Sequence, residues 1–256
     1  MCVEDHQGIK ACGQSLIFLL LYRLNGRAKH VTTRSVDNPI KCIIFDFDGV
    51  LVDSKKLYVH VIWSALKTFG EYYRKDVERQ LIPSISGTLS KFLKKPEELA
   101  QAVRVVNEII LHEENLRLLK PCMGVPEIPK MLSSQGSYNM GLLTNSYRIF
   151  LEKGLARLGL EDCFEWTIAA DDGFESKQDG CFSLIKHFRS SERTTLYIGD
   201  TNHDVEIARD VGCRVAIVLN PCSWMWSYKE KVKKSNPDYI LPSLNALPNL
   251  LETLAT

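Results

Sequence analysis

The stretch CIIFDFDGVLVDS, residues 42–54, places two carboxylates directly after an apolar run. Residues 40–47 predict a buried strand, because β-branched and aromatic residues follow one another without polar alternation. Asp46 and Asp48 fall where that strand ends, with only Phe47 between them. Carboxylates beside an apolar core are costly unless they are paired or bind a metal. The stretch therefore predicts a polar site at the end of the strand.

The composition is that of an ordinary soluble globular protein. Hydrophobic residues make up 45% of the 256 positions and charged residues 25%, and 32 Lys+Arg balance 31 Asp+Glu. A net charge near zero provides no general basic field for nucleic acid or for an anionic membrane surface. A small phosphorylated ligand held by local charges is compatible with this balance. The length allows one large core domain with a smaller inserted one.

The eight cysteines are scattered along the chain, with no Cys-x-x-Cys pair and no Cys/His cluster at zinc-site spacing. Several of them lie in apolar, strand-like or helix-like stretches. We therefore expect buried, reduced thiols. Because disulfides are rare in the cytosol, this usage favours a cytoplasmic protein.

Residues 1–39 share no pattern with the rest of the chain and are predicted to form an N-terminal extension of unknown role. Leu16–Tyr22 is strongly apolar but far too short to span a bilayer. No clean basic segment precedes it and no small-residue cleavage site follows. A helical or disordered extension, packing on the core or on a partner, is therefore preferred to a signal peptide, and a contact with a membrane surface is left open.

Residues 54–120 are predicted to be helical. Apolar residues recur at three- and four-residue spacing in LYVHVIWSALKTFG and LAQAVRVVNEIILHEENLRLL, as they do in amphipathic helices. Pro83, Gly87 and Pro96 are expected to divide the segment into several helices. Four aromatic residues of the segment are assigned to its interior in preference to stacking on a base of the substrate; they are Trp63, Phe69, Tyr72 and Tyr73.

After Pro121 short strands alternate with helices. Strands are predicted within 138–146, 164–170, 194–200, 214–220 and 238–241, and helices at 148–160, 181–190, 204–212 and 245–254. Such alternation implies a mostly parallel sheet with helices on both faces. The strand at 40–47 belongs to this sheet, and the helical segment between them is an insertion.

In an open parallel sheet, ligands bind beyond the carboxyl ends of the strands. Asp46, Thr144 and Asp200 all follow predicted strand ends, so residues far apart in the sequence are expected to converge on one edge. Each motif has an ordinary explanation alone, since Thr144 favours local turns and GDTNHD (199–204) is also a helix-capping turn. Four motifs in order favour one functional site over separate coincidences.

The four motifs resemble those of the haloacid dehalogenase (HAD) superfamily, close to its phosphoglycolate-phosphatase-like branch. They are DFDGVLVDS (46–54), LLTNS (142–146), Lys177 and GDTNHDVEIARDVG (199–212), within a match that covers residues 40–250. The resemblance implies an α/β fold, with a Rossmann-like core formed by 40–53 and 121–256 and an inserted helical cap at 54–120. A proline often follows the third-motif lysine in this family, whereas this chain has SKQDG; Lys177 is nevertheless preferred to Lys153 and Lys186.

The resemblance also implies the catalytic roles. Asp46 would attack phosphorus to form an aspartyl-phosphate, and Asp48 would protonate the leaving oxygen and then activate water. Mg²⁺ would be held by the side chain of Asp46, the backbone carbonyl of Asp48 and the carboxylate of Asp200. Asp204 would support the metal site or Lys177.

The same resemblance assigns substrate-binding groups. Thr144 and the backbone N–H of Asn145 would bind the transferring phosphoryl oxygens, and Lys177 would neutralise their charge. Gly49 would permit close backbone approach to the phosphate. Gly87 resembles the cap segment that faces the active site in related phosphatases.

Two further groups have more than one interpretation. Lys91, Lys94 and Lys95 in the cap either meet an anionic leaving group or form a solvated helix face, and the solvated face is preferred. Trp224 and Trp226 follow a strand, where they form either an edge of the core or a contact between the subunits of a homodimer.

We therefore expect a Mg²⁺-dependent phosphatase that hydrolyses a small phosphorylated metabolite, with phosphoglycolate as the first choice. The dehalogenases of this superfamily lack the acid that Asp48 provides, because a halide leaves without a proton. The alternatives are a phosphosugar or nucleotide phosphatase, a phosphomutase, and a non-catalytic HAD-like binding protein. No motif indicates nucleic-acid recognition or a stable membrane span.

Overall fold

The computed structural model of the chain describes residues 39–255. The predictions for the N-terminal extension, including the apolar stretch Leu16–Tyr22, fall on residues outside this range. Within the described residues, no helix combines the length and the apolar character needed to cross a membrane.

A six-stranded sheet lies at the centre of the described chain, in the order β5-β4-β1-β6-β7-β8. Every neighbouring pair is parallel. The strands are β1 (Cys42–Phe45), β4 (Asn139–Leu143), β5 (Trp166–Ile168), β6 (Thr195–Gly199), β7 (Arg214–Val218) and β8 (Tyr239–Leu241). The most N-terminal strand pairs with β4 on one side and β6 on the other, which confirms the predicted α/β architecture.

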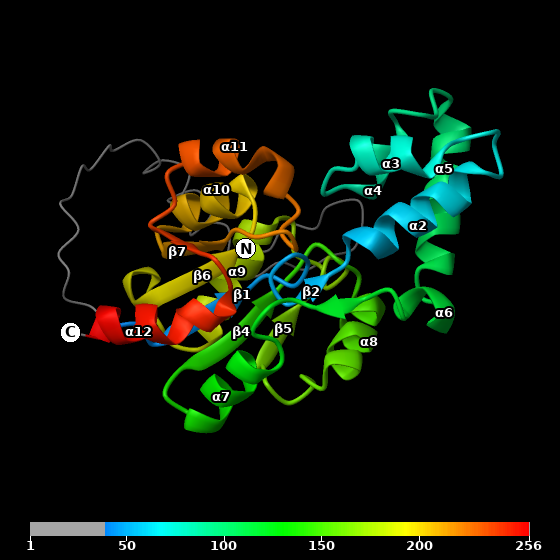
Figure 1. Cartoon of the computed structure of the whole chain (residues 1–256). Helices are drawn as coiled ribbons and strands as arrows, with labels where there is room; N and C mark the ends of the chain where they lie inside the picture. Colours follow the sequence, from blue (N-terminus) through cyan, green and yellow to red (C-terminus); the bar gives the residue numbers. More distant parts are fainter. Residues whose placement is uncertain (1–38, 256) are drawn as a thin grey trace, which may run out of the picture. The chain divides into compact units, whose positions relative to one another are not determined.

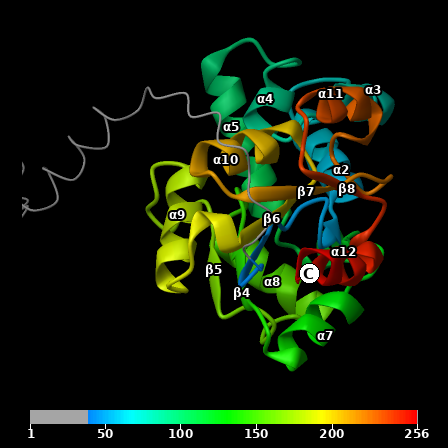
Figure 2. The same ribbon diagram turned by 90° about the vertical axis from the view of Figure 1, so that its left-hand side faces the viewer.

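Helices cover both faces of the sheet (Figures 1 and 2). One face carries α9 (Lys177–His187), α10 (Asn202–Val211) and α11 (Lys229–Lys234), and the other carries α7 (Glu127–Gln135), α8 (Arg148–Leu158) and α12 (Leu247–Ala255). Successive side chains of a strand point to opposite faces. Strand β1 accordingly sends Ile43 and Phe45 into one apolar layer and Cys42 and Ile44 into the other.

Several elements differ from the sequence prediction. Strand β1 ends at Phe45, two residues early, and α9 begins at Lys177 because the Ser176 hydroxyl caps it by accepting from the Asp179 N–H. The short helices α7 and α11 were not predicted. The described part of the core also contains three 3₁₀ turns: η1 (Glu192–Thr194), η2 (Trp226–Tyr228) and η3 (Leu244–Ala246).

A helical insertion separates β1 from the later strands. It lies between β2 (Val52–Asp53) and β3 (Lys120–Pro121), which pair with each other in antiparallel fashion. It contains α2 (Lys55–Leu66), α3 (Arg74–Gln80), α4 (Ile85–Leu89), α5 (Pro96–Ile109) and α6 (Glu113–Leu116) (Figure 1). We call residues 54–120 the cap, with the boundaries expected from the sequence.

The expected helix breaks in the cap are correct at two of three positions. Pro83 lies between α3 and α4, and Pro96 is the first residue of α5, where its missing N–H costs nothing. Gly87 does not break a helix. It lies within α4, and its N–H donates to the hydroxyl of Ser84, the N-cap.

The aromatic residues of the cap do not all lie in its interior. Trp63, Phe69 and Tyr72 pack against the buried apolar cluster, and the Trp63 indole N–H also donates to the Tyr72 carbonyl at 2.8 Å. The prediction is wrong for Tyr73, which is 73% exposed. Tyr73 is the N-cap of α3 and has extended backbone angles, so the chain turns there and carries the ring into solvent.

The six cysteines among the described residues are free thiols, and five of them are buried. The expected burial is correct for those five, and the reduced state stays a prediction. A cytoplasmic location stays a prediction.

Phe47, the residue between the two acidic residues, is packed tightly into the core. The Phe47 ring is fully buried and meets the Phe150 ring edge-on, with 6.1 Å between the ring centroids. It also fills the space beside Gly154 in α8, where a Cβ atom would lie 2.4 Å from Phe47 Cζ. Helix α8 therefore has a glycine where the aromatic ring presses against its backbone.

We expect Gly154→Ala to lower the free energy of unfolding by about 1–3 kcal/mol because of this overlap. Alanine is the better helix former by about 1 kcal/mol, so a gain in stability would contradict the close packing. Thermal denaturation of Gly154→Ala, Phe47→Leu and the double variant provides the test. The two changes should be less destabilising together than the sum of their separate effects, because leucine lacks the atom that the new methyl group meets.

Candidate active site

The carboxyl ends of β1, β4 and β6 open onto one cavity of about 1010 Å³, which cap residues also line. Seven of the residues predicted from the sequence line it: Asp46, Asp48, Thr144, Asn145, Lys177, Asp200 and Asp204. Gly49 does not line it but lies against Asp200. Gly87 lies behind the wall that its neighbours Ser84 and Ser86 form.

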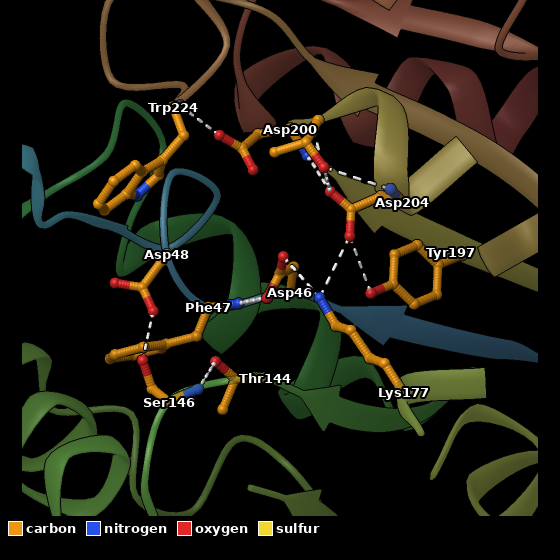
Figure 3. Close-up of polar contacts among 11 residues, drawn as sticks. Asp46, Phe47, Asp48, Thr144, Ser146, Lys177, Tyr197, Asp200, Asp204 and Trp224 are labelled. Atoms are coloured by element: carbon orange, nitrogen blue, oxygen red, sulfur yellow. Dashed lines mark hydrogen bonds and ion pairs between the residues drawn. The ribbon is translucent and has the colours of Figure 1, made fainter. Parts of the chain in front are cut away.

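Lys177 joins two of the carboxylates (Figure 3). Its Nζ atom lies 2.9 Å from Asp46 Oδ2 and 3.2 Å from Asp204 Oδ1, and its side chain is 5% exposed. Because Lys177 is the first residue of α9, the start of that helix brings the ammonium group to the end of β1. Lys153 instead pairs with Glu113 at the surface, and Lys186 does not line the cavity.

Burial and mutual repulsion determine the charges in the site. Burial raises the pKa of Asp46 to about 7 although Lys177 opposes the change, and it raises the pKa of Asp200 well above its usual range, with repulsion from Asp204 and Asp46 adding to the effect. Burial alone would lower the pKa of Lys177, but Asp204 and Asp46 outweigh it and raise that pKa. The site thus favours a cation beside its carboxylates.

Asp204 is fully engaged by the protein. Its Oδ1 atom accepts from Lys177 and from the Tyr197 hydroxyl, and Oδ2 accepts from the Asp200 N–H and from the N–H and hydroxyl of Thr201. Burial would raise its pKa, but Lys177 and Thr201 hold it below the usual value. Asp204 therefore orients Lys177 and also caps α10. The segment GDTNHD (199–204) thus both contributes side chains to the cavity and forms a helix-capping turn.

Asp200 is held by a loop that follows β7. The Trp224 N–H donates to Asp200 Oδ2 at 2.5 Å, and the Trp224 side chain lines the cavity (Figure 3). The sequence did not predict this contact, because its donor is a backbone N–H, which almost every residue type has. Trp226 is 36% exposed, with Lys229 Nζ 4.7 Å from its ring centroid.

Asp48 is bound by two serines that the sequence analysis did not single out. The Ser54 hydroxyl donates to Oδ1 at 2.5 Å and the Ser146 hydroxyl to Oδ2 at 2.7 Å. Tyr58, from cap helix α2, lies 3.3 Å from the Ser146 oxygen. Burial raises the pKa of Asp48, and the two hydroxyls partly oppose this. Serine is too common for its presence at the ends of the first two motifs to predict these contacts.

Acidic residues at and just beyond the strand ends fit a divalent cation. Carboxylate oxygens of Asp46, Asp200 and Asp204 lie within 4.8 Å of one another, and Asp204, in the first turn of α10, is the one that protein donors already engage. Oxygen ligands are those that Mg²⁺ prefers. Burial raises the pKa values of Asp46 and Asp200 and so disfavours their charged forms, an effect that a bound cation would oppose.

A parallel sheet with buried carboxylates and a lysine at one edge, covered by a helical insertion, defines a capped α/β enzyme. Residues 43–218 match the model of the haloacid dehalogenase-like hydrolase family. The chain therefore belongs to that family, and it is a hydrolase of the phosphatase type.

Relatives by sequence match most of the chain. Pyrophosphatase PpaX of Halalkalibacterium halodurans is 26% identical over 218 residues, which are 83% of this chain and 96% of that protein. Pyrophosphatase PpaX of Bacillus mycoides is 28% identical over 223 residues, which are 84% of this chain and 98% of that protein.

Solved structures share the fold. A predicted phosphoglycolate phosphatase from Haemophilus somnus has a TM-score of 0.72 at 20% identity, covering 82% of this chain and 97% of its own. A haloacid dehalogenase-like family protein from Streptococcus pneumoniae has a TM-score of 0.70 at 19% identity, covering 82% of this chain and 98% of its own.

Gly49→Ala should disturb the acidic site through contact as well as through strain. Gly49 has φ +80°, and a Cβ atom there would lie 2.1 Å from Asp200 Oδ2. We expect a loss of about 1–3 kcal/mol in the free energy of unfolding and a smaller rise in melting temperature on adding Mg²⁺.

Gly173→Ala is the matched control, because Gly173 has φ +84° and open space where a Cβ atom would lie. It should lose stability through strain alone and keep the full response to Mg²⁺. An equal response to Mg²⁺ in the two variants would contradict the assigned position of Asp200.

Proposed function

We propose that the protein is a Mg²⁺-dependent phosphatase that hydrolyses the phosphomonoester of a small metabolite through an aspartyl-phosphate on Asp46. One observation carries the proposal. The Asp46 carboxylate lines the cavity between a buried lysine and the carboxylate of Asp200, while Asp48, two residues on, is hydrogen-bonded by hydroxyl groups instead of a cation. Two carboxylates in such different surroundings suit a nucleophile and a proton carrier.

In the first step, a carboxylate oxygen of Asp46 attacks phosphorus and the bond from phosphorus to the leaving oxygen breaks. The Phe47 N–H donates to Asp46 Oδ1 at 2.7 Å, which fixes the carboxylate against rotation. Asp48, in its protonated form, gives its proton to the leaving oxygen. The raised pKa of Asp48 is consistent with that form.

In the second step, Asp48 takes a proton from water, the water oxygen attacks phosphorus, and the bond between phosphorus and Asp46 breaks. Inorganic phosphate leaves and both aspartates return to their starting forms. Thr144 Oγ1 accepts from the Ser146 N–H at 3.0 Å, so its own hydroxyl proton can be donated to a phosphoryl oxygen. Lys177 and the Asn145 N–H would complete the set of donors.

Asp46 and Asp200, with the backbone carbonyl of Asp48, would hold Mg²⁺ in this scheme. The ion would supply positive charge that lets an anionic nucleophile approach an anionic phosphate. Asp204, whose oxygens are taken by other donors, would act through Lys177 and Asp200.

The leaving group is a separate question. A phosphosugar or a nucleotide is the alternative from the sequence. Phosphoglycolate is the first choice, and the relatives named pyrophosphatases make pyrophosphate a further candidate. Both require the same transfer of a phosphoryl group to Asp46. They differ in the group that leaves, because phosphoglycolate is an ester and pyrophosphate an anhydride, and in what the cap has to accommodate.

The central test measures phosphate release from p-nitrophenyl phosphate. We expect activity with Mg²⁺, loss of activity with a chelator and recovery when Mg²⁺ is restored. Asp46→Asn should lower kcat by at least about a thousandfold, since it removes the nucleophile. Asp162→Asn, at an exposed position, makes the same change in charge and should leave the rate unaltered. Undiminished activity in folded Asp46→Asn would refute the proposal.

Ser146→Ala tests the role of Asp48 as proton donor. It removes the hydroxyl that orients Asp48 Oδ2, so kcat/KM should fall about tenfold for an alkyl phosphate, whose leaving oxygen needs a proton. The fall should be much smaller for p-nitrophenyl phosphate, because p-nitrophenolate leaves without one. Equal losses for the two esters would instead indicate general damage to the site. Ser134→Ala, at an exposed serine of α7, is the control.

A further inference from the structure

The wall that the cap contributes to the cavity carries no charged side chain among the described residues. It presents hydroxyl and amide groups, from Ser84, Ser86 and Asn107, beside apolar groups that include Ile82 and Val103. The charged groups that line the cavity within residues 39–255 all come from the core. The cap is thus neutral where it faces the site.

The lysines of the cap make their contacts elsewhere. Lys91 Nζ donates to the Gln80 carbonyl at 2.7 Å, and Lys94 Nζ donates to the Ser90 carbonyl at 2.8 Å. Lys95 pairs with Glu98 at 2.8 Å. None of the three lines the cavity, which favours the solvated helix face preferred from the sequence.

Three basic residues of the core line the cavity among the described residues, namely Lys177, His203 and Lys231. Lys177 is held by Asp46 and Asp204 and would serve the transferring phosphoryl group. His203 Nδ1 lies 3.2 Å from Glu206 Oε2, and Lys231 is exposed to solvent. A second anionic group bound under the cap would therefore find no cation on the cap wall. On the core side it would meet the carboxylates of the site, with the exposed Lys231 as the cation left to pair with it among the described residues.

From this distribution we infer that the enzyme prefers phosphomonoesters whose leaving group is uncharged, a sugar or a nucleoside, over pyrophosphate and phosphoglycolate. This inference rests on the proposed phosphatase function. Pyrophosphate and phosphoglycolate each carry a second anion, and burying an unpaired anion is costly. Hydroxyl and amide groups beside apolar side chains suit a polyhydroxylated leaving group. A cavity of about 1010 Å³ also exceeds what glycolate needs.

A substrate panel tests the inference with the full-length protein and Mg²⁺. It contains glucose 6-phosphate, a nucleoside 5′-monophosphate, phosphoglycolate and pyrophosphate, each measured by kcat/KM. We expect the better of the two uncharged leaving groups to exceed both anionic ones by about tenfold or more. A smaller lead, or a lead of either anionic substrate, would overturn the inference.

A charge introduced on the cap wall should change the order of the four substrates by kcat/KM. Ser86→Lys should raise kcat/KM for phosphoglycolate and pyrophosphate relative to the sugar or nucleoside ester by about threefold or more. Ser134→Lys adds the same charge on α7, outside the cavity, and should leave the ranking unchanged. Asn107→Asp is the second variant, and it should lower the relative rate of the anionic substrates. If the ranking is the same in all three variants, the cap wall does not select the leaving group.

Lys231→Ala covers the remaining cation at the rim. It should leave the ranking of the panel unaltered, and a selective loss of pyrophosphate hydrolysis would show that Lys231 binds a second phosphate and would contradict the inference. Failure of the proposed function would look different, because Asp46-dependent hydrolysis of p-nitrophenyl phosphate would then be absent altogether.

Discussion

The buried ion pair between Lys177 and the carboxylates of Asp46 and Asp204 is the interaction on which the site depends. A single buried carboxylate is expensive, and several together are more so unless a cation lies among them. Lys177 reaches Asp46 because α9 begins at the edge where β1 and β6 end, and Asp204 reaches Lys177 because the capping turn of α10 directs it there. The parallel sheet is therefore the frame that brings one cation and its carboxylates together.

The sequence predicted the parts of the site that are marked by a recognisable local pattern. Asp46, Thr144 and Asp200 could be placed at one edge because strand ends are visible as apolar runs that stop at a polar residue. Lys177 could be placed only through the order of the motifs, since nothing beside it marks a buried lysine. Its assignment rested on resemblance, and the structure gives it a physical reason in two short contacts.

What the sequence did not predict falls into two kinds. The contact from Trp224 to Asp200 uses a backbone N–H, and the hydroxyls of Ser54 and Ser146 belong to a residue type that occurs everywhere, so neither leaves a recognisable pattern. Gly87 and Tyr73 were misjudged for another reason. Glycine is only a weak helix breaker, and an aromatic side chain at a helix terminus follows the direction of the chain more than its own hydrophobicity.

The cap enters and leaves the core at a single place, because β2 and β3 lie side by side as an antiparallel pair. Chain segments whose ends are adjacent can be lengthened, shortened or exchanged without moving the strands that they interrupt. The residues that would carry out phosphoryl transfer belong to the core, whereas the neutral wall over the cavity belongs to the insertion. The residues for catalysis and the residues for substrate selection would therefore lie in different parts of the chain. A change of substrate would require substitutions in one contiguous segment of sequence, the cap.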